Sequence, residues 1–128
     1  MFINCIGFAP TPDQAIVIPF LYKRTVTGKF NQVYWKSFEE EFEVWEIIRA
    51  ALENPEIGII FQNGMFDAQV LYRFYQIRTR AFLYDTMLRH HAMYPELPKA
   101  LGFLGSVYTN ERAWKGMRAR GGTEKKDD

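Results

Sequence analysis

The 128-residue sequence contains a single cysteine and almost no net charge. Because Cys5 has no second cysteine to pair with, an internal disulfide is excluded, and a reducing, intracellular setting is favoured over an oxidising one. The 16 Lys and Arg residues nearly balance the 15 Asp and Glu residues. With no overall field to attract nucleic acid, any such binding must depend on a local patch or a bound metal.

Long apolar runs are also missing. No run approaches the roughly 20 residues that cross a bilayer. The N-terminus has neither the charged start nor the cleavage site of a signal peptide. We therefore expect no membrane insertion and no secretion, and we expect a cytoplasmic location.

What the chain does contain is apolar and aromatic material. Hydrophobic residues make up 48% of the sequence and aromatic residues 16%, which is typical of a packed globular domain. The length fits one domain or part of one. The apolar pattern stops after Trp114, so we expect an ordered domain over residues 1–115 and a disordered polar tail over residues 116–128.

The N-terminal part predicts a hairpin and a helix. Residues 3–9 and 15–19 are short β-branched runs separated by a proline-containing turn, which indicates two paired strands. Residues 21–35 show no sustained period and are interpreted as a long loop with room for some extended structure. Ser37 and Glu40 then form a capping box before an apolar repeat of helical spacing.

The C-terminal part alternates strand and helix patterns. An apolar run at residues 57–61 is typical of a strand buried on both faces in a parallel sheet. The next helix should present one apolar face, and a short strand should end at Asp85. Helices over 86–93 and 99–108 follow, separated by two prolines. The order of elements predicts an α/β domain with a mixed sheet.

The most informative segment for function is Phe61-Gln62-Asn63-Gly64-Met65-Phe66-Asp67. It places an amide at the end of a strand and a carboxylate four residues later on a helix, so both should face the crevice beyond the strand ends, where ligands usually bind. A carboxylate there suits Mg²⁺ or Mn²⁺. An alternative stays open: Asn63 caps the helix and Asp67 accepts local hydrogen bonds in its first turn.

This segment resembles the second exonuclease motif, N-x-x-x-D, of DnaQ-like 3'-5' exonuclease domains of family A DNA polymerases from bacteria and phages. Residues 3–9 with 16–19, and 85–91 with 97–104, are similar to the flanking parts of that domain. The resemblance implies an RNase H-like mixed sheet flanked by helices. It also implies Asp67 as a catalytic metal ligand for Mg²⁺ or Mn²⁺, with Gln62, Asn63 and Phe66 as substrate-binding residues.

The family's other two motifs do not occur in this sequence. D-x-E would lie just before Met1 on a central first strand, and Y-x-x-x-D would follow the polar tail. The family's two-metal hydrolysis needs a pair of ions about 3.5–4 Å apart, which one aspartate cannot hold. We therefore expect a partial exonuclease domain lacking its first central strand, inactive alone.

The resemblance implies the single-stranded 3' end of DNA as a partner, with a polymerase or the rest of the domain on another chain. A noncatalytic nucleic-acid-binding or polymerase-assembly module is the alternative, and a gene fragment without a role is a third possibility.

Other residues are weaker candidates for the site. Asp85 is expected to cap a helix rather than bind metal. The neighbouring His90 and His91 do not share a helix face, so they are expected to be ordinary histidines. Some tyrosines could stack on bases, but such residues more often complete a core. Some basic residues near the C-terminus could follow a phosphate backbone, but a solvated segment is the commoner explanation. The tyrosines are Tyr72, Tyr75 and Tyr84, and the basic residues are Arg112, Lys115, Arg118 and Arg120.

Overall fold

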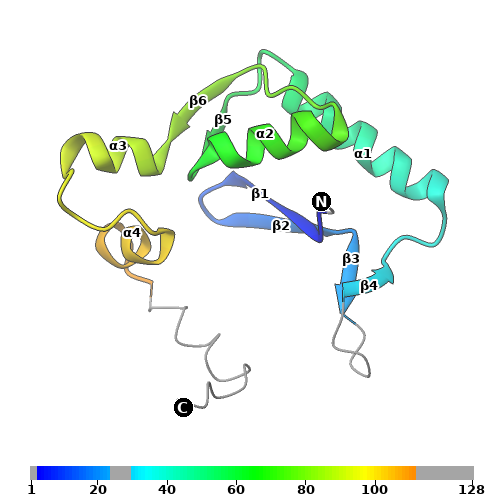
Figure 1. Ribbon diagram of the computed structural model, residues 1–128, viewed down its shortest axis with the longest axis horizontal. Coiled ribbons are helices and arrows are strands. Elements are labelled where there is room, and N and C mark those ends of the chain that lie inside the picture. The colour runs from blue at the N-terminus through cyan, green and yellow to red at the C-terminus, as the bar shows by residue number, and fades with distance from the viewer. Residues whose placement is uncertain (1–2, 24–29, 112–128) are drawn as a thin grey trace. The chain divides into compact units, whose positions relative to one another are not determined.

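The computed structural model describes residues 3–23 and 30–111, and Figure 1 shows its elements in chain order. The described residues form two compact units, drawn from Met1–Ile57 with Gln69–Ala81 and from Gly58–Ala68 with Phe82–Asp128. Residues 116–128, expected to be a disordered tail, lie outside the described residues. None of the described helices is both long enough and apolar enough to cross a bilayer. The elements are β1 (Cys5–Thr11), β2 (Gln14–Pro19), β3 (Leu21–Lys23), β4 (Phe30–Val33), α1 (Phe38–Glu53), β5 (Ile59–Phe61), α2 (Gly64–Tyr75), β6 (Phe82–Asp85), α3 (Thr86–Met93) and α4 (Leu101–Tyr108).

The strands form antiparallel and parallel pairs. β1 pairs with β2 and β3 with β4 in antiparallel fashion, whereas β5 and β6 run parallel. This confirms the predicted α/β class. Within the described residues, however, the strands make three separate two-stranded sheets rather than one mixed sheet. The RNase H-like arrangement therefore stays a prediction.

The first unit contains both antiparallel hairpins. The expected hairpin of β1 and β2 is confirmed, with Ile6 opposite Ile18. Its turn consists of Pro12 and Asp13. The extended structure allowed for in the loop over residues 21–35 is present, because β3 and β4 pair there with Leu21 opposite Val33, but their pairing was not predicted. Cross-strand hydrogen bonds stabilise this pair although its sequence alternates too irregularly to show a period.

Helix α1 begins as the capping box predicts. The Ser37 hydroxyl accepts a hydrogen bond from the Glu40 N–H at 3.2 Å, and the Glu40 carboxylate accepts one from the Lys36 N–H at 3.1 Å. Ile48 and Leu52 are buried on its inner face. A stack of three rings packs this unit, with Trp45 between Phe20 and Tyr75 at centroid distances of 4.2 and 4.3 Å. The stack joins α1 to the end of α2.

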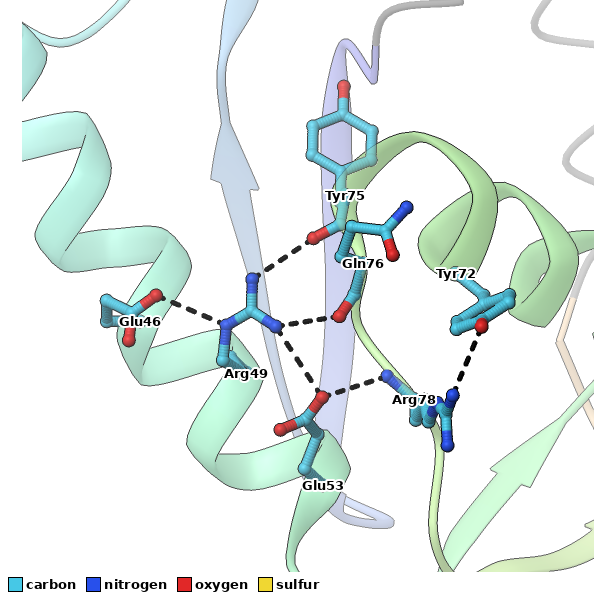
Figure 2. A network of polar contacts seen from close by, with 7 residues as sticks. All are labelled: Glu46, Arg49, Glu53, Tyr72, Tyr75, Gln76 and Arg78. Atoms are coloured by element: carbon cyan, nitrogen blue, oxygen red, sulfur yellow. Dashed lines mark hydrogen bonds and ion pairs between the residues drawn. The ribbon is translucent and has the colours of Figure 1, made fainter.

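Arg49 of α1 ties the C-terminus of α2 to α1 (Figure 2). Its guanidinium donates to the carbonyl of Gln76 at 2.8 Å and to that of Tyr75 at 3.1 Å. Glu46 and Glu53 flank it at 3.2 and 3.5 Å. Cations near a helix C-terminus are favourable because the last carbonyls have no partner within the helix.

The parallel pair β5–β6 and the first turn of α2 belong to the second unit. The predicted strand is confirmed at Ile59–Phe61, and its parallel partner ends at Asp85 as expected. The prediction that it is buried on both faces was wrong, because Ile60 is 62% exposed. The apolar run marks a strand, but it does not show what covers the faces of that strand. The apolar face expected for α2 is only partly buried: Leu71 is buried, whereas Phe66 and Phe74 are exposed.

Helices α3 and α4 of the second unit meet around His90. The His90 ring is buried, and its Nδ1 lies 2.8 Å from the Tyr108 hydroxyl. The rings of Tyr94, Phe103 and Tyr108 surround it with centroids at 5.6–6.0 Å. His90 is therefore a core histidine, and the proline-containing break between the two helices is confirmed.

Candidate functional site

The candidate site lies where β5 and β6 end. The two strands run parallel, and Phe61 is the register partner of Asp85, so their carboxyl ends lie side by side. Helix α2 begins at Gly64, and helix α3 begins at Thr86. Two helix N-termini, each with unpaired N–H groups, therefore follow the same end of the sheet.

The Asp85 carboxylate accepts hydrogen bonds from backbone N–H groups at the start of both helices. Its Oδ1 accepts hydrogen bonds from the N–H groups of Met87 at 2.9 Å and Leu88 at 3.4 Å, which cap α3 as predicted. The same Oδ1 accepts from Asn63 at 3.0 Å, and Oδ2 accepts from Gly64 at 2.7 Å. We call these four bonds the Asp85 double cap. Asp85 is 4% exposed, and its carboxylate is committed to backbone donors.

The two carboxyl groups of the site have pKa values that shift in opposite directions. Burial opposes the ionisation of Asp85, but the four backbone N–H groups outweigh it and lower its pKa below the usual range. Partial burial raises the pKa of Asp67, and the negative charge of Asp85 raises it further. Asp67 lies in the first turn of α2. It is the carboxylate that a cation would stabilise most, since it is close to a fixed charge of its own sign.

Asn63 adopts an unusual backbone conformation, with φ at 59° in the left-handed region. Asparagine tolerates this region better than most residues. Its N–H points to Asp85, and its carbonyl accepts from Phe66 at 3.3 Å. A Cβ on Gly64 would clash with the side chain of Phe61, so only glycine fits the start of the helix.

The alternative interpretation of this segment holds only in part, because Asn63 directly precedes α2 and its carbonyl accepts from Phe66, but its side chain does not cap the helix. Asn63 was considered as a side-chain cap, and Asp67 as an acceptor of local hydrogen bonds. Within the described residues neither side chain makes a hydrogen bond, and Asp85 caps the helix instead. Asn63 and Asp67 are both exposed.

Two neighbours of the motif were also expected to bind substrate. The Gln62 amide donates to the Lys99 carbonyl at 3.2 Å and so holds the segment that precedes α4. Its amide oxygen has no hydrogen-bond partner among residues 3–23 and 30–111. Phe66 is 56% exposed on the first turn of α2, next to Asp67 in the sequence. Their substrate contacts stay predictions.

Comparison with known families decides what this arrangement belongs to. A family model described as a 3'-5' exonuclease of the DNA polymerase A type matches residues 19–110. The chain belongs to this 3'-5' exonuclease family. No curated protein and no solved structure gives a significant match.

The 3'-5' exonuclease family uses divalent metal, which is bound by oxygen ligands. Asp67 fits one hard oxygen ligand, whereas the oxygens of Asp85 are taken by backbone donors. Over residues 3–23 and 30–111 no cluster of three His, Cys, Asp or Glu side chains could hold an ion. The described part of this exonuclease-family chain thus fits one ligand, not the whole set for two metals.

Other residues named from the sequence are distributed over the exonuclease-family chain. Tyr75 belongs to the ring stack of the first unit, as the core alternative expects. Tyr72 carries the Arg78 guanidinium 5.0 Å above its ring, and Tyr84 carries that of Arg89 at 4.6 Å. The candidate basic positions Arg112, Lys115, Arg118 and Arg120 lie outside the described residues.

The bonds from Asp85 to Asn63 and Gly64 are what the sequence did not predict. An aspartate before a helix gives a clear local signal for its own cap. Asp85 also accepts hydrogen bonds from Asn63 and Gly64, which lie 22 and 21 positions earlier in the sequence. Local sequence patterns carry no information about contacts over such separations.

Proposed function

We propose that the chain contributes Asp67 as a metal ligand to a 3'-5' exonuclease site of the kind found with family A DNA polymerases of bacteria and phages. The site would act on single-stranded 3' ends of DNA in the cytoplasm. The observation that carries this proposal is an exposed carboxylate beside the buried charge of Asp85, within the segment matched by the exonuclease family. A bound cation would relieve the repulsion between the two carboxylates.

The reaction adds water across the terminal phosphodiester, releases a nucleoside 5'-monophosphate and leaves a shortened strand with a free 3' hydroxyl. Mg²⁺ or Mn²⁺, when bound, stabilises the charge that develops on the phosphate oxygens. Asp67 would hold the ion. Asn63, Gln62 and Phe66 would orient the terminal nucleotide, the amides by hydrogen bonds and the ring by stacking on the base.

Asp67 alone does not complete the site. The remaining carboxylates, and the first central strand of an RNase H-like sheet, would come from elsewhere in the same protein or from another chain. We therefore expect this chain by itself to bind the metal and the 3' end but not to hydrolyse DNA.

The test is an NMR titration of the chain with a single-stranded hexanucleotide, with and without Mg²⁺. We expect shifts of the amide signals of Gln62–Asp67 only when Mg²⁺ is present, because the ion bridges carboxylate and phosphate. Asp67→Asn should abolish them, while Asp13→Asn, in the exposed β1–β2 turn, should keep them. Equal shifts for both variants would contradict the assignment of Asp67.

A noncatalytic nucleic-acid-binding module is the second candidate. It is favoured by the exposed Tyr84 ring with the Arg89 guanidinium 4.6 Å above it, since aromatic rings and arginines bind single strands without metal. A gel shift with single-stranded DNA separates the two. Metal-independent binding that weakens steeply with salt, and that Tyr84→Ala removes, would support the module.

A further inference from the structure

We infer that Asp85 is a positioning residue for the metal ligand Asp67. The inference rests on the proposed function, since it concerns the same ligand. Asp85 itself does not contact the metal or the DNA. Asp85 acts on Asp67 through the backbone at the start of α2. There its carboxylate accepts hydrogen bonds from the N–H groups of Asn63 and Gly64.

The two carboxylate oxygens of Asp85 accept hydrogen bonds from different donors. Oδ1 accepts hydrogen bonds from Met87, Leu88 and Asn63. Among residues 3–23 and 30–111, Oδ2 accepts only from Gly64, at the shortest distance of the four, 2.7 Å. The bond to Gly64 is buried. A single oxygen thus holds the first residue of α2, three residues before Asp67.

The local backbone needs this support. Asn63 is held at φ 59°, and the Gly64 Cα approaches the Phe61 side chain so closely that no Cβ fits. A left-handed residue costs on the order of 1 kcal/mol and persists only where its surroundings impose it. The Asp85 double cap imposes it here, and it thereby sets where the first turn presents Asp67.

Three substitutions of Asp85 separate its bond to the start of α2 from its negative charge and from its cap of α3. In Asp85→Asn the amide oxygen replaces Oδ1 and the NH₂ group faces the Gly64 N–H, so the α3 cap remains and the bond to Gly64 is lost. Asp85→Glu retains the charge, but its extra methylene does not fit a side chain that is 4% exposed. Asp85→Ser retains an α3 cap but is too short to reach α2.

The experiment measures two quantities on each full chain. Amide hydrogen exchange reports the bonds at Gly64 and Met87, and broadening of amide signals around Asp67 by Mn²⁺ alone reports ion binding. We expect faster exchange at Gly64 in all three variants, unchanged exchange at Met87 in Asp85→Asn, and Mn²⁺ binding weakened about tenfold, as is typical when a residue that orients a ligand is lost.

Thr86→Val is the matched control. It removes the 3.3 Å hydrogen bond from Thr86 Oγ1 to the Phe61 carbonyl and loosens the same strand pair without touching the double cap. Its Mn²⁺ binding should equal that of the wild type.

Two results would overturn the inference: Asp85→Glu binding Mn²⁺ like the wild type, which would leave only a charge effect, or Thr86→Val weakening binding as much as Asp85→Asn. Absence of Mn²⁺ binding in the wild type would instead contradict the proposed function. The exchange at Gly64 and Met87 would still show whether the double cap acts on α2.

Discussion

The Arg49 guanidinium donates a 2.8 Å hydrogen bond to the carbonyl of Gln76, 27 residues away, and so joins the middle of α1 to the end of α2. Gln76 has φ 55°, and its N–H bonds back to the Tyr72 carbonyl at 3.1 Å. This is the left-handed termination that helices commonly use. Arg49 therefore stabilises a helix end of the first unit.

Arg49→Met should destabilise the chain by about 1–3 kcal/mol, because charged hydrogen bonds to two carbonyls are lost and the carbonyls lose their partner. Arg49→Lys should restore only part of it, since one ammonium cannot reproduce the forked contact. Urea denaturation followed by tryptophan fluorescence measures both. Arg73→Met on the exposed part of α2 is the control and should cost under about 0.5 kcal/mol. Equal losses at both positions would contradict the role of Arg49.

Gln76→Gly should stabilise the chain by up to about 1 kcal/mol. Glycine adopts the left-handed conformation without the clash that a Cβ brings, and the backbone carbonyl that Arg49 contacts is unchanged. Gln76→Val, which is β-branched, should destabilise. Thermal unfolding of the two variants gives the order. If glycine destabilises as much as valine, the termination is not limited by the φ of this residue.

Gly64→Ala should lower the free energy of unfolding by about 1–3 kcal/mol. The alanine Cβ would clash with the first atoms of the Phe61 side chain, which are too close to the Phe61 backbone to move aside. Gly7→Ala in β1 is the control, since its nearest neighbour would be the Ile16 carbonyl oxygen at an ordinary 3.9 Å. Chemical denaturation should show a clear loss for the first and none for the second. A harmless Gly64→Ala would mean that the close approach to Phe61 is not required.

Asp85 should make stability fall in acid. Its pKa is lowered in the folded chain, so its contribution is complete above the unfolded value of about 3.9 and is lost as the pH falls towards the folded value. The free energy of unfolding of the wild type should therefore approach that of Asp85→Asn below about pH 4. A gap between them that stays constant from pH 6 to pH 3 would contradict the double cap as the source of this shift.

Asp67→Asn should act in the opposite direction. The pKa of Asp67 is raised in the folded chain, so its ionised form destabilises the fold above the folded pKa, and the penalty vanishes below the unfolded value of about 3.9. The variant should be more stable than the wild type at pH 7 and equal to it in strong acid. Destabilisation at pH 7 would show that Asp67 has a structural role.

The sequence predicted those features that depend on nearby residues. Ser37 and Asp85 stand directly before their helices, and both caps are found where expected. The parallel strand pair followed from an apolar run and its turn signals. Pairing of β3 with β4 was missed because the segment lacks a period, and the exposure of Ile60 was missed because an apolar run says nothing about what covers it.

The candidate site was predictable to the same extent. The spacing of Asn63 and Asp67 indicated a polar strand end followed by a carboxylate on a helix. The bond between Asp85 and Gly64 was not predictable, because it depends on the parallel register that brings residues 21 positions apart together.

The measurement that tests the central claim most directly is the broadening of amide signals by Mn²⁺ in the wild type, Asp67→Asn and Asp13→Asn. We predict broadening centred on the first turn of α2 in the wild type and in Asp13→Asn, and its loss in Asp67→Asn. Broadening that persists in Asp67→Asn, or that is centred away from α2, would contradict Asp67 as the metal ligand.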